Sequence, residues 1–132
     1  MHLIRAVSAT AAAALVFVGT VPGAGAATAE RSCSVHGFVG TIRLVQARAG
    51  APITFYYKIG KGTNPGGNKA NVNLTFDTEP STHWYIPDAM IQDDAFHRLA
   101  TFGPQAVPVG VSFVFDLAHA PDPSCGVWVS TI

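Results

Sequence analysis

Charged residues are scarce in this sequence, at 12% of the chain, and neither sign dominates. The 8 Lys and Arg residues equal the 8 Asp and Glu residues, so the formal net charge is zero with neutral histidines. Nucleic-acid-binding domains carry a basic patch or stripe, and no such cluster is visible here. We therefore expect no nucleic-acid partner.

Long apolar runs are absent after the N-terminal region. Residues 6–18 are mostly apolar, follow a single basic residue and lead into small residues, which is typical of a cleaved export signal. The run is shorter than the about 20 residues that span a bilayer. We predict a signal peptide over 1–26 with Ala27 as the new terminus, or alternatively Glu30. The remaining single domain, 27–132, is expected to be secreted and not to insert into a membrane.

Cysteine occurs only twice, at Cys33 and Cys125. In an exported chain we expect the two to form a disulfide, and two buried free thiols are the alternative. The bond would close most of the mature chain into one loop and stabilise it by roughly 4 to 5 kcal/mol on the chain-entropy model.

Apolar and polar residues alternate with a period of two through the mature region, and turn residues interrupt this pattern at short intervals. The pattern predicts an all-β fold, an antiparallel β-sandwich of about eight short strands that is Ig-like or jelly-roll-like. A bend is expected at Gly40, and Pro87 is expected to end a strand. The predicted strands are 33–39, 41–47, 53–59, 70–77, 82–86, 96–102, 109–117 and 124–131.

Residues 89–100 allow two interpretations. Asp88 would cap a helix that carries apolar residues at helical spacing, or residues 92–94 form a turn before a strand. We prefer the turn and strand because the rest of the chain is β. The inward-facing aromatic residues expected in the core are Phe55, Tyr57, Phe76, Phe113 and Phe115.

Recognisable sets of catalytic residues are absent. There is no Gly-x-Ser-x-Gly turn, no two histidines have the short spacing that zinc sites favour, and both cysteines are assigned to the disulfide. We predict no enzymatic activity, no cofactor and no bound metal. A structural calcium ion is an alternative that we do not favour, suggested by the loop carboxylates Asp88, Asp93, Asp94, Asp116 and Asp122.

Polar and aromatic residues share the predicted wet face of two strands. Tyr56 and Lys58 alternate with core residues on one strand, and Asn71 and Asn73 do so on the next. If these strands pair, the four side chains and Trp84 would form a strip that hydrogen-bonds and stacks on a glycan. Alternatively they only solvate an outer face or cover a second sheet. Trp128, and either His83 or Trp84, also fall on the outward-facing side of their strands or near loop ends.

The loop 60–69 has no apolar residue and contains four glycines, Gly60, Gly62, Gly66 and Gly67, so it is expected to be exposed. Lys61 or Lys69 in this loop would fit a basic-specific protease pocket. A proteinase inhibitor or protein-interaction factor is therefore a second hypothesis.

Four segments carry a resemblance to known proteins. They are Tyr57-Lys58-Ile59, Asn64-Pro65-Gly66-Gly67-Asn68-Lys69-Ala70-Asn71-Val72-Asn73-Leu74, Phe113-Val114-Phe115-Asp116 and Asp122-Pro123-Ser124-Cys125. Through them the chain resembles a group of small, secreted, single-disulfide β proteins of the actinobacterial type, to which no activity is assigned. Residues 92–97 are similar to the Asp-Gly-x-Trp-His turn of laminin-G-like and lectin-like sandwiches, with Asp94 for the glycine and Phe96 for the tryptophan. That second similarity supports a strand at this place and no binding function.

We expect an exported, non-enzymatic binding module for an extracellular glycan or a cell-envelope component. The predicted binding residues are Tyr56, Lys58, Asn71, Asn73 and Trp84. A structural protein of the cell surface is a third hypothesis, suggested by the apolar, low-charge composition.

Overall fold

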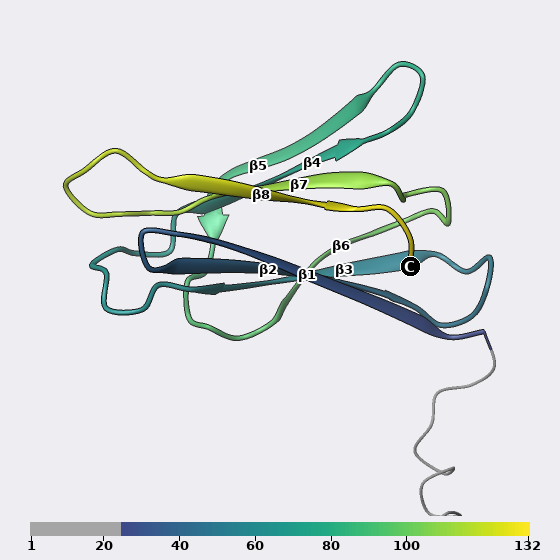
Figure 1. Ribbon diagram of the computed structural model, residues 1–132, viewed down its shortest axis with the longest axis horizontal. Coiled ribbons are helices and arrows are strands. Elements are labelled where there is room, and N and C mark those ends of the chain that lie inside the picture. The colour runs from purple at the N-terminus through teal and green to yellow at the C-terminus, as the bar shows by residue number, and fades with distance from the viewer. Residues whose placement is uncertain (1–24) are drawn as a thin grey trace, which may run out of the picture.

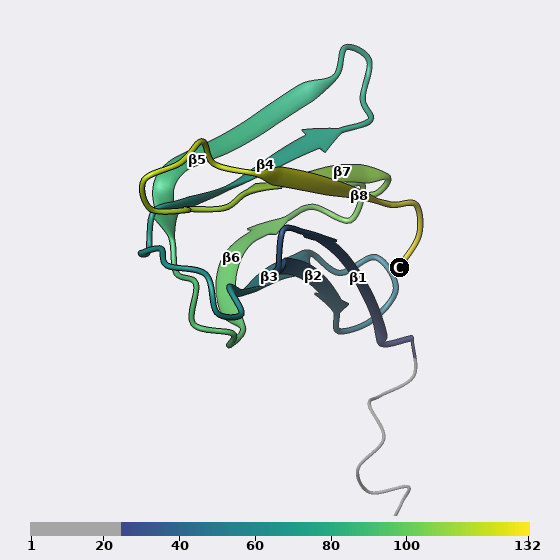
Figure 2. The same ribbon diagram turned by 60° about the vertical axis from the view of Figure 1, so that its left-hand side comes forward.

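The computed structural model describes residues 25–132, which form two four-stranded antiparallel sheets stacked face to face (Figures 1 and 2). One sheet has the strand order β1-β2-β3-β6 and the other β5-β4-β7-β8. The predicted all-β sandwich of eight strands is confirmed. The strands are β1 (Ala27–Val35), β2 (Phe38–Gln46), β3 (Ile53–Gly60), β4 (Ala70–Phe76), β5 (Thr82–Met90), β6 (His97–Phe102), β7 (Val109–Val114) and β8 (Ser124–Val129).

The predicted signal peptide, 1–26, lies outside the described residues except for its last two positions. β1 begins at Ala27, so cleavage before Ala27 would leave the strand whole, whereas cleavage before Glu30 would remove its first three residues. Within residues 25–132 we find no helix that could cross a membrane.

The turn between β1 and β2 lies at His36 and Gly37, so the bend predicted at Gly40 is wrong. Both turn residues have positive φ angles, 50° and 87°, which is the conformation of a two-residue type I′ hairpin. Gly40 lies inside β2, where an added Cβ would come within 2.6 Å of the Phe113 ring. This glycine therefore permits close packing between the sheets and makes no turn.

β5 continues past Pro87, so the predicted end of this strand is also wrong. The register between β4 and β5 shifts between Ala70 and Val72, and Asp88 in this irregular stretch has a φ of 49°. Proline is tolerated here because β5 is an edge strand and does not need an amide hydrogen on its open side. After β5, residues 91–96 turn and lead into β6, which confirms the preferred turn and strand over the helix.

The core lies between the inner faces of the sheets. Four of the five aromatic residues predicted for it are buried, and Phe76 packs against it half-buried. Its largest fully buried side chains are Phe38, Phe55, Phe113, Phe115, Ile42, Leu44, Ile53, Ile59, Leu74, Val72, Val109 and Val111.

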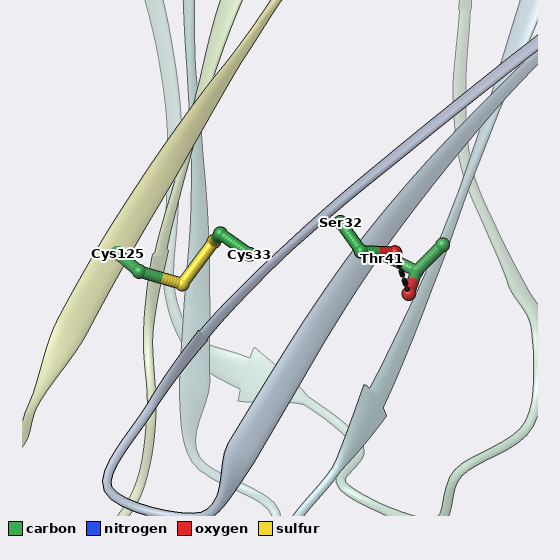
Figure 3. The surroundings of a disulfide bond; sticks show 4 residues. All are labelled: Ser32, Cys33, Thr41 and Cys125. Atoms are coloured by element: carbon green, nitrogen blue, oxygen red, sulfur yellow. Dashed lines mark hydrogen bonds between the residues drawn. A yellow bond between two sulfur atoms is a disulfide. The ribbon is translucent and has the colours of Figure 1, made fainter.

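A disulfide between Cys33 and Cys125 joins the sheets along one side, which confirms the predicted pairing over free thiols (Figure 3). It links β1 and β8, the edge strands on that side, so it ties together the first and last strands. Such a bond is compatible with an extracellular location.

Candidate ligand-binding face

The predicted strip of Tyr56, Lys58, Asn71 and Asn73 does not form, because β3 and β4 belong to different sheets. The chain crosses from one layer to the other between these strands (Figure 1). Tyr56 and Lys58 therefore lie on the outer face of one sheet, and the two asparagines lie on the outer side of the other.

On their sheet, Tyr56 and Lys58 lie in a charged neighbourhood. Tyr56 is in register with Arg43 on one side and Arg98 on the other. The ring of Phe96 folds onto this face, with its centroid 3.7 Å from the Arg43 guanidinium carbon and 4.8 Å from the Lys58 ammonium. This cation–π cluster is not visible in the sequence pattern, because Phe96 comes from the turn before β6.

Asn71 and Trp84 are not available at an exposed face. Asn71 is 7% exposed, and its amide donates a hydrogen bond to the Ile86 carbonyl at 3.4 Å. Trp84 is in register with the buried Leu74, so it points to the inner side of its sheet. There it meets the ring of Phe102 edge-on, with the centroids 5.8 Å apart.

Of the predicted binding residues on the β5-β4-β7-β8 sheet, Asn73 alone lies on the outer face without being buried. The outer face of the β5-β4-β7-β8 sheet has two adjacent rows of side chains that cross all four strands. We call these eight residues the Tyr85–Trp128 face. One row is Tyr85, Asn73, Ser112 and Gly126, and the other is His83, Thr75, Gly110 and Trp128.

Two large aromatic side chains stand exposed on this face, Tyr85 at 60% and Trp128 at 51%. They lie on the two edge strands, three strand spacings apart, which is about 14 Å. The alternation Trp84, Tyr85, Ile86 signals an outward Tyr85, although Tyr85 is not among the predicted binding residues. Trp128 is predicted to face outward but is likewise not one of them.

Gly110 allows the Trp128 indole to lie low over the sheet. A Cβ at Gly110 would be 3.1 Å from Cζ3 and 3.2 Å from Cε3 of the indole, so the ring occupies the space that a side chain would fill. The indole therefore lies over the β7 backbone at Gly110.

Small polar groups fill the space between the two aromatic residues. The Asn73 carboxamide oxygen is buried and accepts no hydrogen bond from the described residues. The Thr75 hydroxyl and Nδ1 of His83 share a hydrogen bond of 3.2 Å. The face contains no Asp, Glu, Lys or Arg, so its chemistry is that of amides, hydroxyls and aromatic rings.

Two of the loop carboxylates accept hydrogen bonds from backbone amides in turns and loops. Asp116 accepts hydrogen bonds from the amides of Gly67 and Lys69, and Asp122 accepts one from Leu117. No group of three or more His, Cys, Asp or Glu side chains among residues 25–132 is arranged to hold a metal ion.

Asp93 makes a local contact with a histidine. Its carboxylate lies 2.7 Å from Nε2 of His97 and accepts a hydrogen bond from the Ala95 amide. The hydrogen bond with His97 is the main cause that lowers the pKa of the Asp93 carboxyl. This pair helps to shape the turn that carries Phe96.

The loop 60–69 is exposed, as predicted, but it is tied to its surroundings. The Lys61 ammonium donates to the Gly66 carbonyl at 2.9 Å, and the Asn64 amide donates to the His36 carbonyl at 2.8 Å. Gln92 is buried beneath the loop and donates to the Gly67 carbonyl at 2.9 Å. Because its ammonium is engaged within the loop, Lys61 is not presented to a protease pocket.

Comparisons of the chain with protein-family models, with curated proteins and with solved structures found no match.

Proposed function

We propose that the protein is a secreted, non-enzymatic binding module that holds a neutral extracellular glycan on the Tyr85–Trp128 face. The observation that carries the proposal is the pair of exposed aromatic residues on one uncharged sheet face. The two rings lie on opposite edge strands of the same outer face, so both can contact one extended ligand laid across the sheet.

The chemistry of the face suits sugar rings. Tyr and Trp offer flat apolar surfaces with a polar edge, against which the C–H face of a sugar ring can stack. Between them, the Asn73 amide nitrogen can donate a hydrogen bond to a sugar hydroxyl, and the Ser112 hydroxyl can donate or accept one.

The shape of the face favours a polymer over a small molecule. An open sheet face that spans about 14 Å gives a small ligand few walls, but it supports several units of an extended chain. Because neither Lys nor Arg lies in the two rows, the face offers no ion pair to an acidic polymer. We therefore assign it to a neutral glycan.

The test is co-sedimentation of the purified mature protein with cellulose, xylan, chitin and isolated cell walls, compared with the double variant Tyr85→Ala/Trp128→Ala. We expect saturable retention of the native protein on at least one matrix and about tenfold or greater loss in the double variant, since each stacked ring contributes roughly 0.5 to 1.5 kcal/mol. Tyr56→Ala, which removes an aromatic ring from the opposite sheet, is the matched control and should be retained normally.

Absence of saturable retention on every matrix would overturn the proposal. Equal retention of the native protein and a folded double variant would also overturn it. Circular dichroism of each variant shows whether the fold is intact.

A further inference from the structure

A cavity of about 330 Å³ opens at the end of the sandwich beneath the turn between β4 and β5. That turn projects away from the rest of the molecule, as both ribbon views show (Figures 1 and 2). The cavity wall includes Phe76 at the end of β4, Trp84 near the start of β5 and Phe102 at the end of β6. Ala106 lines it from the loop that follows.

The three aromatic residues form a connected apolar wall. The Phe102 centroid is 4.9 Å from that of Phe76 and 5.8 Å from that of Trp84, with the indole nearly perpendicular to the phenyl ring. Phe55 packs against Phe102 from the core at 5.0 Å and supports the wall from behind. All three wall residues are only half-buried, so their rings keep apolar surface that no described residue covers.

None of the residues that line the cavity is Asp, Glu, Lys or Arg. The cavity is open to solvent on one side, and an ionic ligand would gain no ion pair from its lining. The lining thus selects an uncharged ligand.

Four polar side chains are among the lining residues, those of Thr78, Thr82, His83 and Gln105. Thr78 and Thr82 share a hydrogen bond, and the His83 imidazole bonds to Thr75 on the outer face of the sheet. The side chain of Gln105 is exposed and makes no hydrogen bond with another residue of the described part. Gln105 is therefore available to a hydroxyl or amide on a bound molecule.

We propose that this cavity is a binding site for a small, uncharged aromatic molecule of about two fused rings that carries one hydrogen-bonding substituent. An apolar cavity of about 150 Å³ is known to take up benzene, so roughly twice that volume corresponds to a bicyclic ring. Ligand sites in proteins begin at about 300 Å³ and combine apolar walls with a few placed polar groups, as here. The site is separate from glycan binding on the outer sheet face and does not depend on it.

The test uses 2-naphthol as the probe and nuclear magnetic resonance as the readout. The sequence has 2 tryptophans, so the nitrogen-15 spectrum shows one indole signal from the cavity wall and one from the outer face. We expect 2-naphthol to shift the Trp84 signal saturably and to leave the Trp128 signal in place. Naphthalene-2-carboxylate has the same rings and a negative charge. Its affinity should be at least about tenfold lower, because the lining offers no ion pair to its carboxylate.

The variant Ala106→Leu fills the cavity and should weaken 2-naphthol binding at least about tenfold. Ala89→Leu, an exposed position on β5 outside the cavity, is the matched control and should bind as the native protein does. If Ala106→Leu fails to fold, Gln105→Ala replaces it, and this variant should weaken the binding of 2-naphthol more than that of naphthalene.

No movement of the Trp84 signal up to the solubility limit of 2-naphthol would overturn the proposal. A shift of the Trp128 signal alone would also overturn it, as would unchanged 2-naphthol binding in folded Ala106→Leu. In Gln105→Ala, an equal loss of affinity for 2-naphthol and for naphthalene would overturn it as well.

Discussion

The Cα atoms of Cys33 and Cys125 lie 6.0 Å apart across 92 positions of sequence, so one covalent bond ties the first strand to the last. The bond closes one side of the sandwich, where β1 and β8 are both edge strands. The opposite side, formed by β5 and β6, has no such link and is where the aromatic cavity opens.

Removal of this bond should cost a large part of the stability of the domain. Replacement of both cysteines by serine is expected to lower the free energy of unfolding by roughly 4 to 5 kcal/mol, because the unfolded chain regains the entropy that the loop removes. Urea unfolding of the oxidised native protein and the double variant measures the difference. A loss below about 1 kcal/mol would show that the bond constrains the unfolded chain little.

Gly40 should not tolerate even one methyl group. Its added Cβ would lie 2.6 Å from the Phe113 ring in the core, so Gly40→Ala is expected to destabilise the protein by about 1 to 3 kcal/mol. The double variant Gly40→Ala/Phe113→Leu should lose less than the sum of the two single variants, because the smaller side chain makes room. Strict additivity of the losses in urea unfolding would contradict the packing argument.

Gln92 should hold the loop 60–69 in place. The residue is 3% exposed, donates to the Gly67 and Asp116 carbonyls and accepts a hydrogen bond from the Asp116 amide. Gln92→Leu would leave these groups without partners, at a cost of about 2 to 4 kcal/mol, and should make the bonds after Lys61 and Lys69 sensitive to trypsin.

Mass spectrometry of timed trypsin digests measures this effect. Gln105→Leu, a change of the same kind at an exposed position, is the control and should digest at the native rate. Equal digestion of Gln92→Leu and the native protein would show that the contacts of Gln92 do not restrain the loop.

Tyr57 should make the protein less stable in strong alkali. Burial raises the pKa of its phenol above the ordinary value of 10.0, and the charge of Asp93 adds to the rise, although the hydrogen bond from the Ile91 amide opposes it. A pKa raised by folding contributes stability below the unfolded pKa, and this is lost as pH rises through the folded pKa. Between about pH 8 and pH 11, native stability should therefore fall more steeply than that of Tyr57→Phe. Parallel pH profiles in urea unfolding would contradict this assignment.

The sequence pattern was sufficient for the class of fold, the disulfide and most of the core. Period-two alternation tells which side chains share a face of one strand, and it assigned Phe55 and Phe113 correctly to the interior. It does not tell which strands pair, because pairing depends on contacts between distant segments. For that reason the predicted strip joined Tyr56 to Asn73, although their strands lie in different layers.

Two local features also cannot be predicted from the period-two alternation. A His-Gly pair is a weaker hairpin signal than Asn-Gly, so the sequence does not distinguish a turn at His36 and Gly37 from a bend at Gly40. The placement of Phe96 over Arg43 follows from how the turn before β6 folds back, which alternation within strands does not describe. By contrast, the outward position of Tyr85 was present in the alternation and could have been predicted.

The most direct test of the proposed glycan-binding face is a chemical footprint of Trp128 in the bound state. The protein is oxidised with a limiting amount of N-bromosuccinimide, free in solution and when retained on the polysaccharide matrix, and oxidation at each tryptophan is followed by mass spectrometry. The proposal predicts that Trp128, which is 51% exposed in the unliganded protein, becomes protected on the matrix, while oxidation of Trp84 on the inner side changes little. Equal oxidation of Trp128 in the free and the retained protein would show that the glycan is held elsewhere and would contradict the proposal.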